Sequence, residues 1–449
     1  MSRYLLTNAA IVTGTSSFRG SLGIDGDVIA GIWHGEVPSF PDAEVIDLGG
    51  KVLMAGGIDA HVHFREPGMT AKGDIASESE AALLGGVTSF IDMPNTVPPA
   101  VTLESLEDKL GRAEATSLIN YGFHIGATNT NPELIEGYLS EGQGGKFAGI
   151  KVFLGSSTGR MLVDDDSALG KIFMMKGKTV LVHCEDEALI RAGLEAARSA
   201  YGDSIPFSLH PRIRSREVCV RSTAKALDLA TRYGTALHIL HVSTADEVEM
   251  IRAAKSVNPR ITAETSANYL WFCDEDYDRL GGRVKCNPAI KTARDRDALR
   301  EALADGTIDT IGSDHAPHLP EEKGKPYLLC PSGIPSIRES LSVAVTVALG
   351  CGIPLTRIAS AFSERAAGIF GIKERGLLKP GFKADLTVID PEASFKVGKG
   401  AGKCGWSPYE GATLKGAVDK VWVNGSLTVD GGKVRLRKDL YRQSPLTFI

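Results

Sequence analysis

The sequence contains no apolar run close to the ~20 residues that cross a membrane, and its opening, MSRYLLTNAAIVTG, lacks the basic and then apolar pattern of a signal peptide. We therefore expect a cytoplasmic protein without membrane contacts. Basic residues are not clustered either. The 50 lysines and arginines are scattered among 55 acidic residues, and with a net charge of -5 the sequence does not predict a basic surface that would bind nucleic acid. The expected partner is a small molecule.

Cysteine is also scarce. The seven cysteines form no CxxC pair and their number is odd, which does not indicate a disulfide framework, so we expect reduced and mostly structural thiols. Cys184 and Cys286 have apolar flanks, which favour small buried side chains over nucleophiles. No internal repeat or low-complexity segment occurs, and a composition of 43% hydrophobic and 23% charged residues is typical of an ordered globular protein.

The two ends of the chain differ from its middle. Short β-type runs such as SLGIDGDVIAGIWHG near the start and KVWVNGSLTV near the end alternate with turn residues, as in antiparallel strands. The 449 residues exceed one ordinary domain, and the two ends can pair into a unit of their own. We predict a small β-sandwich domain formed by residues 1–54 and 378–449.

The middle of the chain, residues 55–377, alternates short apolar runs with longer segments of helical periodicity. This pattern predicts an α/β fold of βα units around a parallel sheet. Eight runs are strand candidates, the number that closes a (β/α)8 TIM barrel. They cover residues 57–64, 86–94, 119–128, 147–155, 178–186, 235–244, 260–267 and 307–315. Nearly all end in a polar or ionisable residue, at the end where barrels place their active sites.

Potential metal ligands follow several of these runs. His61 and His63 are two apart on the first, so both rings project to one face and can reach a single metal. An isolated pair of this kind is more often two core histidines. However, His183 ends the fifth run, His241 the sixth and Asp314 the eighth. Five groups therefore converge, and imidazoles with a carboxylate are ligands for zinc or a similar divalent ion.

The other histidines are weaker candidates for metal ligands. His238 is three residues from His241 and points to the opposite strand face, and His241 is nearer the C-terminal end. We assign His241 as the ligand and His238 to packing. His34, His124 and His210 lack comparable neighbours and are expected to be structural or exposed.

Lys151 lies in the apolar run FAGIKVFLG, which indicates a buried strand. Burying an ammonium is costly, so the pKa of Lys151 should fall and a neutral amine should become available. A neutral amine can add carbon dioxide and form a carbamate, whose two oxygens could bridge two metals. The alternative is a lysine whose head reaches the barrel rim.

Several motifs together resemble the dihydroorotases of the amidohydrolase superfamily, over nearly the whole chain. They are DAHVHFREPG (59–68), DMPNT (92–96), IKVFLGSSTG (150–159), HCED (183–186), HVST (241–244), NP (287–288), SDHAPHLPEEK (313–323) and GLLKPGFKADLTVID (376–390).

This resemblance implies specific roles. Two metal ions would be held by His61 and His63, by His183 and His241, and by a bridging carbamate on Lys151, with Asp314 as a metal neighbour and catalytic acid/base. The substrate-binding positions would be His63, Arg65, Asn95, Asn287, His318, Ser332 and Gly333. Zinc is the expected ion, and carbon dioxide the source of the carbamate. A homo-oligomer, with a dimer favoured, is expected.

Two stretches depart from the family pattern. Residues 266–269 read SANY where many relatives carry Thr-Pro-His-His, and residues 335–338 read PSIR where Gly-Leu-Glu-Thr is usual. The resemblance therefore does not predict these loops or a further metal there. Glu264 is at most a secondary candidate.

The implied reaction is the reversible cyclisation of N-carbamoyl-L-aspartate to dihydroorotate, a step of pyrimidine biosynthesis. Two metals could activate a bridging water and polarise the carbonyl, while Asp314 carries the proton to the ring nitrogen. Arg65 would bind the substrate carboxylate through two parallel hydrogen bonds, unless it merely pairs with Glu66 at the surface. A dihydropyrimidinase, hydantoinase or allantoinase is the main alternative, and an inactive scaffold is a more distant one.

Overall fold

The computed structural model describes residues 3–37, 39–156, 161–435 and 443–449. Residues 157–159 of the motif IKVFLGSSTG therefore lie outside the described residues. Within the described ranges, no helix is both long enough and apolar enough to cross a membrane.

The middle of the chain forms a closed parallel barrel. Its strands are β6 (Gly57–Val62), β7 (Val87–Asp92), β8 (Asn120–Phe123), β9 (Ile125–Gly126), β10 (Gly149–Phe153), β11 (Thr179–His183), β12 (Leu237–Ile239), β13 (Ile261–Ser266) and β14 (Thr310–Gly312). They pair in the orders β6-β7-β8 and β9-β10-β11-β12-β13-β14, and a parallel bridge between Val62 and His315 closes the ring. The third expected strand is divided into β8 and β9 at His124, so all eight expected strand positions are confirmed.

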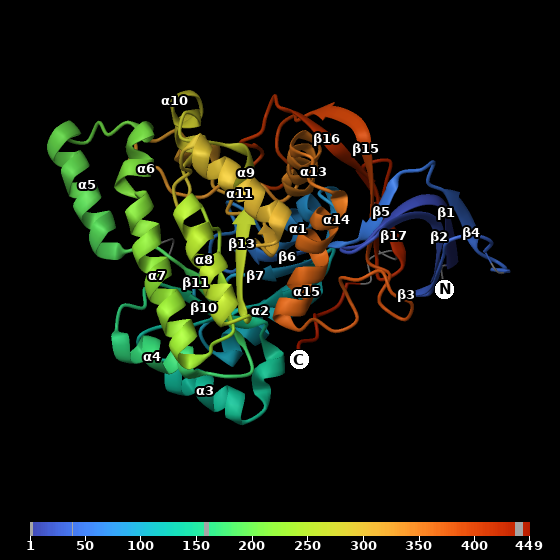
Figure 1. The fold of residues 1–449 in the computed structure, drawn as a ribbon, viewed down its shortest axis with the longest axis horizontal. Helices are drawn as coiled ribbons and strands as arrows, with labels where there is room; N and C mark the ends of the chain where they lie inside the picture. Colours follow the sequence, from blue (N-terminus) through green and yellow to red (C-terminus); the bar gives the residue numbers. More distant parts are fainter. Residues whose placement is uncertain (1–2, 38, 157–160, 436–442) are drawn as a thin grey trace.

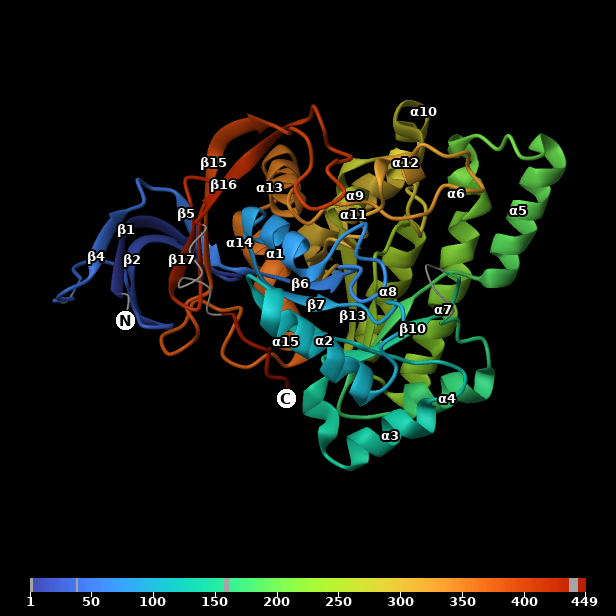
Figure 2. The same ribbon diagram turned by 180° about the vertical axis from the view of Figure 1, so that it is seen from behind.

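Helices cover the outside of the barrel, as Figures 1 and 2 show from opposite sides. The longer ones are α1 (Ile75–Leu84), α2 (Leu103–Thr116), α3 (Pro132–Ser140), α4 (Asp166–Met174), α5 (Glu187–Tyr201), α7 (Arg216–Tyr233), α8 (Ala245–Val257), α11 (Ala293–Asp305) and α13 (Ser340–Cys351). Shorter ones are α6 (His210–Ile213), α9 (Ala267–Trp271), α10 (Asp276–Leu280), α12 (Pro320–Lys323), α14 (Leu355–Ala359) and α15 (Arg365–Phe370). Single turns occupy η1 (Gln143–Lys146), η2 (Phe207–Leu209), η3 (Gly281–Val284) and η4 (Ser360–Glu364).

Local sequence explains where the helices begin. At the start of α8, the Thr244 side chain accepts from the backbone N–H of Glu247, and the Glu247 side chain accepts from that of Thr244. Thr292 and Asp295 form the same reciprocal pair at the start of α11. Each pair satisfies two backbone donors that a helix start leaves free, so the chain turns from a strand end into a helix at a defined residue.

Both ends of the chain join one separate sheet, visible at the side of the barrel in Figure 1. Its strands are β1 (Arg3–Val12), β2 (Ser17–Asp25), β3 (Val28–Trp33), β4 (Glu44–Asp47), β5 (Val52–Ala55), β15 (Leu386–Lys396), β16 (Thr413–Val423), β17 (Ser426–Asp430) and β18 (Lys433–Val434). The pairing of β5 with β15 joins the N-terminal strands to the C-terminal ones. This arrangement confirms the predicted barrel with a β-domain built from both termini.

The terminal sheet curls around its own core. Tyr4 on β1 and Trp422 on β16 are separated in the sheet by β5 and β15, yet their ring centroids are only 6.2 Å apart. Strands ~4.8 Å apart in a flat sheet would hold them much farther from each other, so the sheet must fold over. The two rings belong to a buried cluster distinct from the main barrel cluster. The domain boundaries at residues 54 and 378 stay predictions.

Two C-terminal segments return to the barrel. Leu446 and Phe448 pack with Ile58, Leu181 and Leu240 in a buried cluster. The loop between β15 and β16 also reaches the barrel, because the indole N–H of Trp406 in that loop donates to the backbone oxygen of His318 after β14. Both the C-terminal tail and this loop therefore contact the barrel.

Candidate active site

The C-terminal ends of the barrel strands open into one cavity. It contains about 380 Å³ of empty space, part of it open to solvent, and is lined by His61, His63, Arg65, Asn95, Lys151, Phe153, His183, His241, Asn287, Asp314, Ala316, Ser332 and Gly333. The structure therefore brings all predicted site residues to this wall except His318, which is not among the lining residues.

His61, His63 and Asp314 form a compact group on one side of the cavity. The Nε2 atoms of His61 and His63 lie 3.3 Å and 3.1 Å from Asp314 Oδ1. One potential ligand atom from each residue lies within 4.8 Å of the other two. Two imidazole nitrogens and a carboxylate oxygen facing a common point fit the coordination of a divalent ion such as zinc.

Glu264 on β13 and Asn95 in the loop after β7 orient these two rings. His61 Nδ1 lies 2.6 Å from Glu264 Oε1, and His63 Nδ1 lies 2.7 Å from Asn95 Oδ1. A carboxylate can only accept, so His61 Nδ1 donates and its Nε2 keeps a lone pair toward the cavity. Glu264, only a secondary candidate from the sequence, thus acquires the contact typical of groups that orient a metal-binding histidine.

His183 and His241 form a second pair. His183 Nδ1 lies 2.9 Å from His241 Nε2. Two nitrogens on one tetrahedral zinc, each at ~2.0 Å from the ion, lie about 3.3 Å apart, so a small movement of the rings would accommodate one ion. On the far side, His183 Nε2 lies 2.9 Å from Glu185 Oε2.

Glu185 and Arg214 support His183 from behind. The Glu185 carboxylate is fully buried and pairs with both His183 and the Arg214 guanidinium. Burial alone would raise the pKa of Glu185, but Arg214 and His183 lower it to about 2. Arg214 also donates to the backbone oxygen of Ser156, at 2.9 Å. Neither residue was predicted from the sequence to have a role, although Glu185 is two residues beyond His183.

Lys151 lies on β10 beside the histidines. Its side chain is buried, and Nζ lies 4.5 Å from the centre of the Phe153 ring. Burial lowers the pKa of Lys151 to about 7. As expected from its apolar flanks, this lysine can present a neutral amine near neutral pH.

Three cavity residues adopt a left-handed backbone conformation that side chains other than glycine rarely take. The φ angles are 67° at Arg65, 37° at His241 and 47° at Asp314. Each residue lies two or three positions beyond the end of its strand. Such conformations cost roughly 1–3 kcal/mol each and persist where the surrounding structure holds them. Here they turn functional side chains toward the cavity.

Arg65 is a buried cation at the cavity wall. Its Nε donates to Pro317 O at 3.1 Å, and its NH2 lies 3.1 Å from His318 Nε2. Burial lowers the pKa of Arg65 to about 10, which leaves the guanidinium charged at neutral pH. In the described part of the chain, no carboxylate forms an ion pair with it. Glu66, the predicted alternative partner, instead contacts Ile75 N and Arg112.

His318 lies behind Arg65 rather than at the cavity surface. Its Nε2 contacts Ser332 O at 3.1 Å, and Trp406 Nε1 donates to its backbone oxygen at 2.7 Å. Asn287 Oδ1 is also buried at the cavity and has no hydrogen-bond partner among the described residues. This free acceptor faces the site that Ser332 and a glycine beside it also line.

His34, His124, His210 and His238 lie outside the cavity lining, and Cys184 and Cys286 are buried. His238 Nδ1 lies 2.8 Å from Thr262 Oγ1, and His124 Nε2 lies 3.0 Å from Ala60 O. His210 is fixed between Tyr327 and Cys286, and exposed His34 stacks on Phe18. Burial raises the pKa of Cys184 and of Cys286 to about 12, which disfavours the reactive thiolate.

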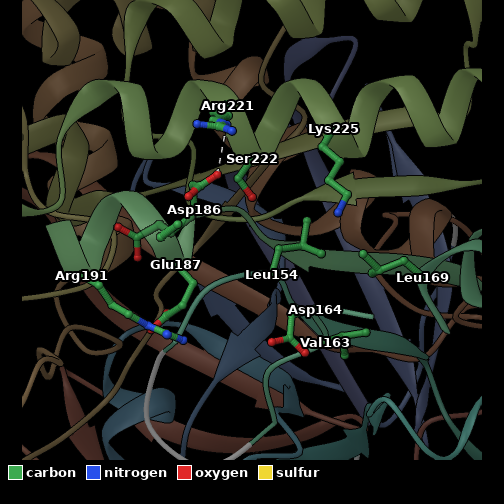
Figure 3. Close-up of a pocket in the computed structure, with 12 residues that line it drawn as sticks. Leu154, Val163, Asp164, Leu169, Asp186, Glu187, Arg191, Arg221, Ser222 and Lys225 are labelled. Atoms are coloured by element: carbon green, nitrogen blue, oxygen red, sulfur yellow. Dashed lines mark hydrogen bonds and ion pairs between the residues drawn. The ribbon is translucent and has the colours of Figure 1, made fainter. Parts of the chain in front are cut away.

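A larger hollow of about 970 Å³ lies at the rim, between the ends of β10 and β11 and helix α7 (Figure 3). Its cations are already paired. Arg221 lies 3.3 Å from Asp186, and Arg191 lies 3.1 Å from Glu187. We therefore place the chemistry in the smaller, histidine-lined cavity.

The chain matches known proteins over almost its full length. The model of the amidohydrolase family matches residues 52–428. A dihydroorotase of Methanosarcina acetivorans is 32% identical over 410 residues, which cover 87% of this chain and 85% of that protein. An allantoinase of Deinococcus radiodurans is 31% identical, with 96% of each chain covered.

Solved structures match the whole fold. An L-hydantoinase (dihydropyrimidinase) from Arthrobacter aurescens superposes with a TM-score of 0.92 at 26% identity, and all of both chains is covered. A dihydropyrimidinase from Brevibacillus agri superposes with a TM-score of 0.90 at 25% identity, covering 100% of this chain and 99% of the other.

Proposed function

The chain belongs to the amidohydrolase family, and from this premise we propose that it is a dihydroorotase that interconverts dihydroorotate and N-carbamoyl-L-aspartate in pyrimidine biosynthesis. Its relatives named dihydroorotase, allantoinase and hydantoinase act on cyclic amides, so the chain is a cyclic amide hydrolase. The choice among these substrates depends on the groups that surround the reacting amide.

The buried Arg65 guanidinium is the observation that carries the choice. A buried cation without a paired carboxylate is costly, and an anionic substrate group entering the cavity would compensate it. Dihydroorotate carries such a carboxylate on its ring, whereas dihydrouracil lacks it. Arginine can bind a carboxylate with two parallel charge-assisted hydrogen bonds.

The ligand set supports two divalent ions, with zinc favoured. His61 and His63 would hold one ion and His183 and His241 the other, while a carbamate on Lys151 would bridge them. The carbamate forms when the neutral amine attacks carbon dioxide and releases a proton. When bound, the ions would lower the pKa of a water molecule and polarise the amide carbonyl.

Asp314 is the proposed proton carrier. Burial would raise the pKa of this carboxyl, but His61 and His63 hold it below its usual value, so Asp314 is ionised and ready to accept a proton. It takes the proton of the water that adds to the carbonyl carbon. It then delivers that proton to the ring nitrogen as the C–N bond breaks. Ring closure runs through the same steps in reverse.

Around this centre, the proposed substrate contacts come from Arg65, Asn287, Ser332 and Gly333. Asn287 offers its unpaired oxygen, and Ser332 and Gly333 offer backbone groups. Asn95 and His318 would partly serve to position other site residues, because Asn95 contacts the His63 ring and His318 contacts Arg65.

Comparative turnover tests the proposal. Purified, zinc-loaded enzyme should hydrolyse dihydroorotate, followed by ultraviolet absorbance, much faster than dihydrouracil, hydantoin or allantoin. Faster turnover of any of the last three would assign the chain to the corresponding cyclic amidase, the second candidate that the allantoinase and hydantoinase similarities favour.

Substitution of Arg65 sharpens this test. Arg65→Lys replaces a planar fork with a point charge, so kcat/KM for dihydroorotate should fall about ten- to a hundredfold, the equivalent of a lost charge-assisted contact. Turnover of dihydrouracil should change little. Arg232→Lys, on the exposed face of α7, is the matched control and should behave as the parent.

A further inference from the structure

Lys323, at the end of α12, is a buried lysine outside the set of residues that line the cavity. Only 4% of its surface is exposed. In the described residues no carboxylate pairs with it. Its Nζ instead donates to three backbone oxygens, those of Lys285 at 3.0 Å and of Pro331 and Gly333 at 2.9 Å each. When protonated, the side chain has three N–H donors, one for each of these carbonyls, and burial lowers the pKa of Lys323 to about 7.

These three oxygens belong to two segments that line the cavity. Pro331 and Gly333 flank Ser332, whereas Lys285 is two residues before Asn287. The backbone N–H of Gly333 also donates to Lys285 O, at 3.0 Å. The ammonium and this bond therefore tie the two walls to each other at the same carbonyl.

Close packing gives this loop little freedom. Gly333 has a φ of 142°, and a Cβ there would lie 2.6 Å from Ala316 O. A second buried lysine, Lys285, donates to the backbone oxygens of Tyr327 at 2.8 Å and Cys330 at 2.6 Å. Lys285 and Lys323 thus both donate to backbone carbonyls of the segment around Ser332, and Lys285 Nζ also lies 4.2 Å from the centre of the Tyr327 ring.

We propose that Lys323 is a positioning residue that sets specificity by fixing the Ser332–Gly333 backbone against Asn287. The inference rests on the proposed function, because it takes this wall to be the one that contacts the ring substituents of the substrate. Without the lysine head, the carbonyls of Pro331 and Gly333 lose this donor and that of Lys285 keeps only the Gly333 N–H, so we expect the loop to move toward water or other partners. Substrate binding should suffer more than the chemistry at the metal ligands.

Two substitutions test this role. Lys323→Met keeps an unbranched side chain, one atom shorter, and removes all three donors. Lys323→Arg keeps the charge, but its planar fork cannot reproduce three bonds arranged around a tetrahedral nitrogen. Lys325→Met, two residues away and exposed, is the matched control. Each variant is purified with zinc, its metal content and melting temperature are measured, and kcat and KM are determined.

We expect KM for dihydroorotate to rise about tenfold or more in Lys323→Met, with a smaller fall in kcat per metal-loaded enzyme and a smaller KM rise in Lys323→Arg. Amide hydrogen exchange across residues 330–334 should become faster in both variants. Lys325→Met should match the parent in every measurement.

Other results would overturn the role. One is an unchanged KM in Lys323→Met, with or without a lower kcat. Another is a loss of activity that is fully explained by a lower metal content. Unchanged exchange at residues 330–334 would do the same, as would failure of Lys323→Arg to fold, since the lysine would then serve general stability. If the parent prefers another cyclic amide, the proposed function fails, whereas KM for that amide and the exchange data still test Lys323.

Discussion

The two histidine pairs of the cavity are supported in different ways. His61 is held by Glu264, 203 residues away in the chain, whereas His183 is held by Glu185, only two residues away. The first pair therefore depends on closure of the barrel, because only the closed barrel brings His61 on β6 close to Glu264 on β13. The second pair depends on a short local segment and on Arg214, which contacts Glu185 from α6's C-terminal side.

This difference predicts unequal responses to substitution. The first pair shares Asp314, and its rings contact Glu264 on β13 and Asn95 in the loop after β7. In the second pair, His241 Nδ1 is buried and has no hydrogen-bond partner among the residues described. The metal site of the first pair, the first half of the centre, is thus more preorganised than that of the second pair, the second half. Substitutions should therefore change the metal affinities of the two halves to different extents.

Removing Lys151 should affect the metal sites of both histidine pairs equally, because the proposed carbamate on this residue bridges them. Lys151→Ala should lose both metal ions and all measurable turnover, with partial recovery on adding a small carboxylic acid. Elemental analysis and the dihydroorotate assay measure the two effects. Exposed Lys171→Ala is the control. Full activity in a metal-loaded Lys151→Ala enzyme would contradict the bridge.

Asp314→Asn should separate chemistry from binding. The amide keeps the size of the side chain but cannot accept and return a proton, so kcat should fall by at least the ~100-fold typical of acid/base groups. The fold, followed by circular dichroism and melting temperature, should persist. A kcat near that of the parent would remove Asp314 from its proposed role.

Glu264→Gln should weaken the first half selectively. A neutral amide holds His61 Nδ1 less firmly and makes the ring less basic, so zinc affinity at one of two sites should fall about ten- to a hundredfold. Competitive titration with a chelator would resolve the two sites. Equal weakening of both sites would show that the halves are not independent.

Glu185→Gln should have the smallest effect on metal affinity, roughly tenfold at the second site. The negative charge of Glu185 is already shared with Arg214, so His183 receives only part of it. The melting temperature should fall as well, because Arg214 loses its charged partner. If this variant loses more zinc than Glu264→Gln, the proposal that the first half is more preorganised than the second is wrong.

Sequence periodicity was sufficient for the barrel and the order of its strands, but several expected runs are longer than the strands, as residues 235–244 are than β12. His61, His63 and His183 could be located because a residue's position on a strand determines the face it occupies. The contacts of Glu264 and Lys323 could not, because each joins segments that only the closed fold brings together. The assignment of specific roles to the cavity residues stays a prediction.

Loop geometry was the least predictable feature. His318 was expected at the cavity wall, but the chain after β14 places it behind Arg65, where it also contacts Ser332. Strand patterns contain no information on such turns. The return of Leu446 and Phe448 to the barrel was also missed, because a short apolar tail gives no sign of its partner.

The pairing of β5 with β15 also has a consequence for synthesis of the chain. Val52 to Ala55 pair with Leu386 to Ile389, so one edge of β5 has no partner until the ribosome has translated the entire barrel. At ~5–20 residues per second, this interval is on the order of tens of seconds. An unpaired strand edge is a template for aggregation during that time, so productive expression should benefit from slow translation at low temperature or from chaperones that shield nascent chains.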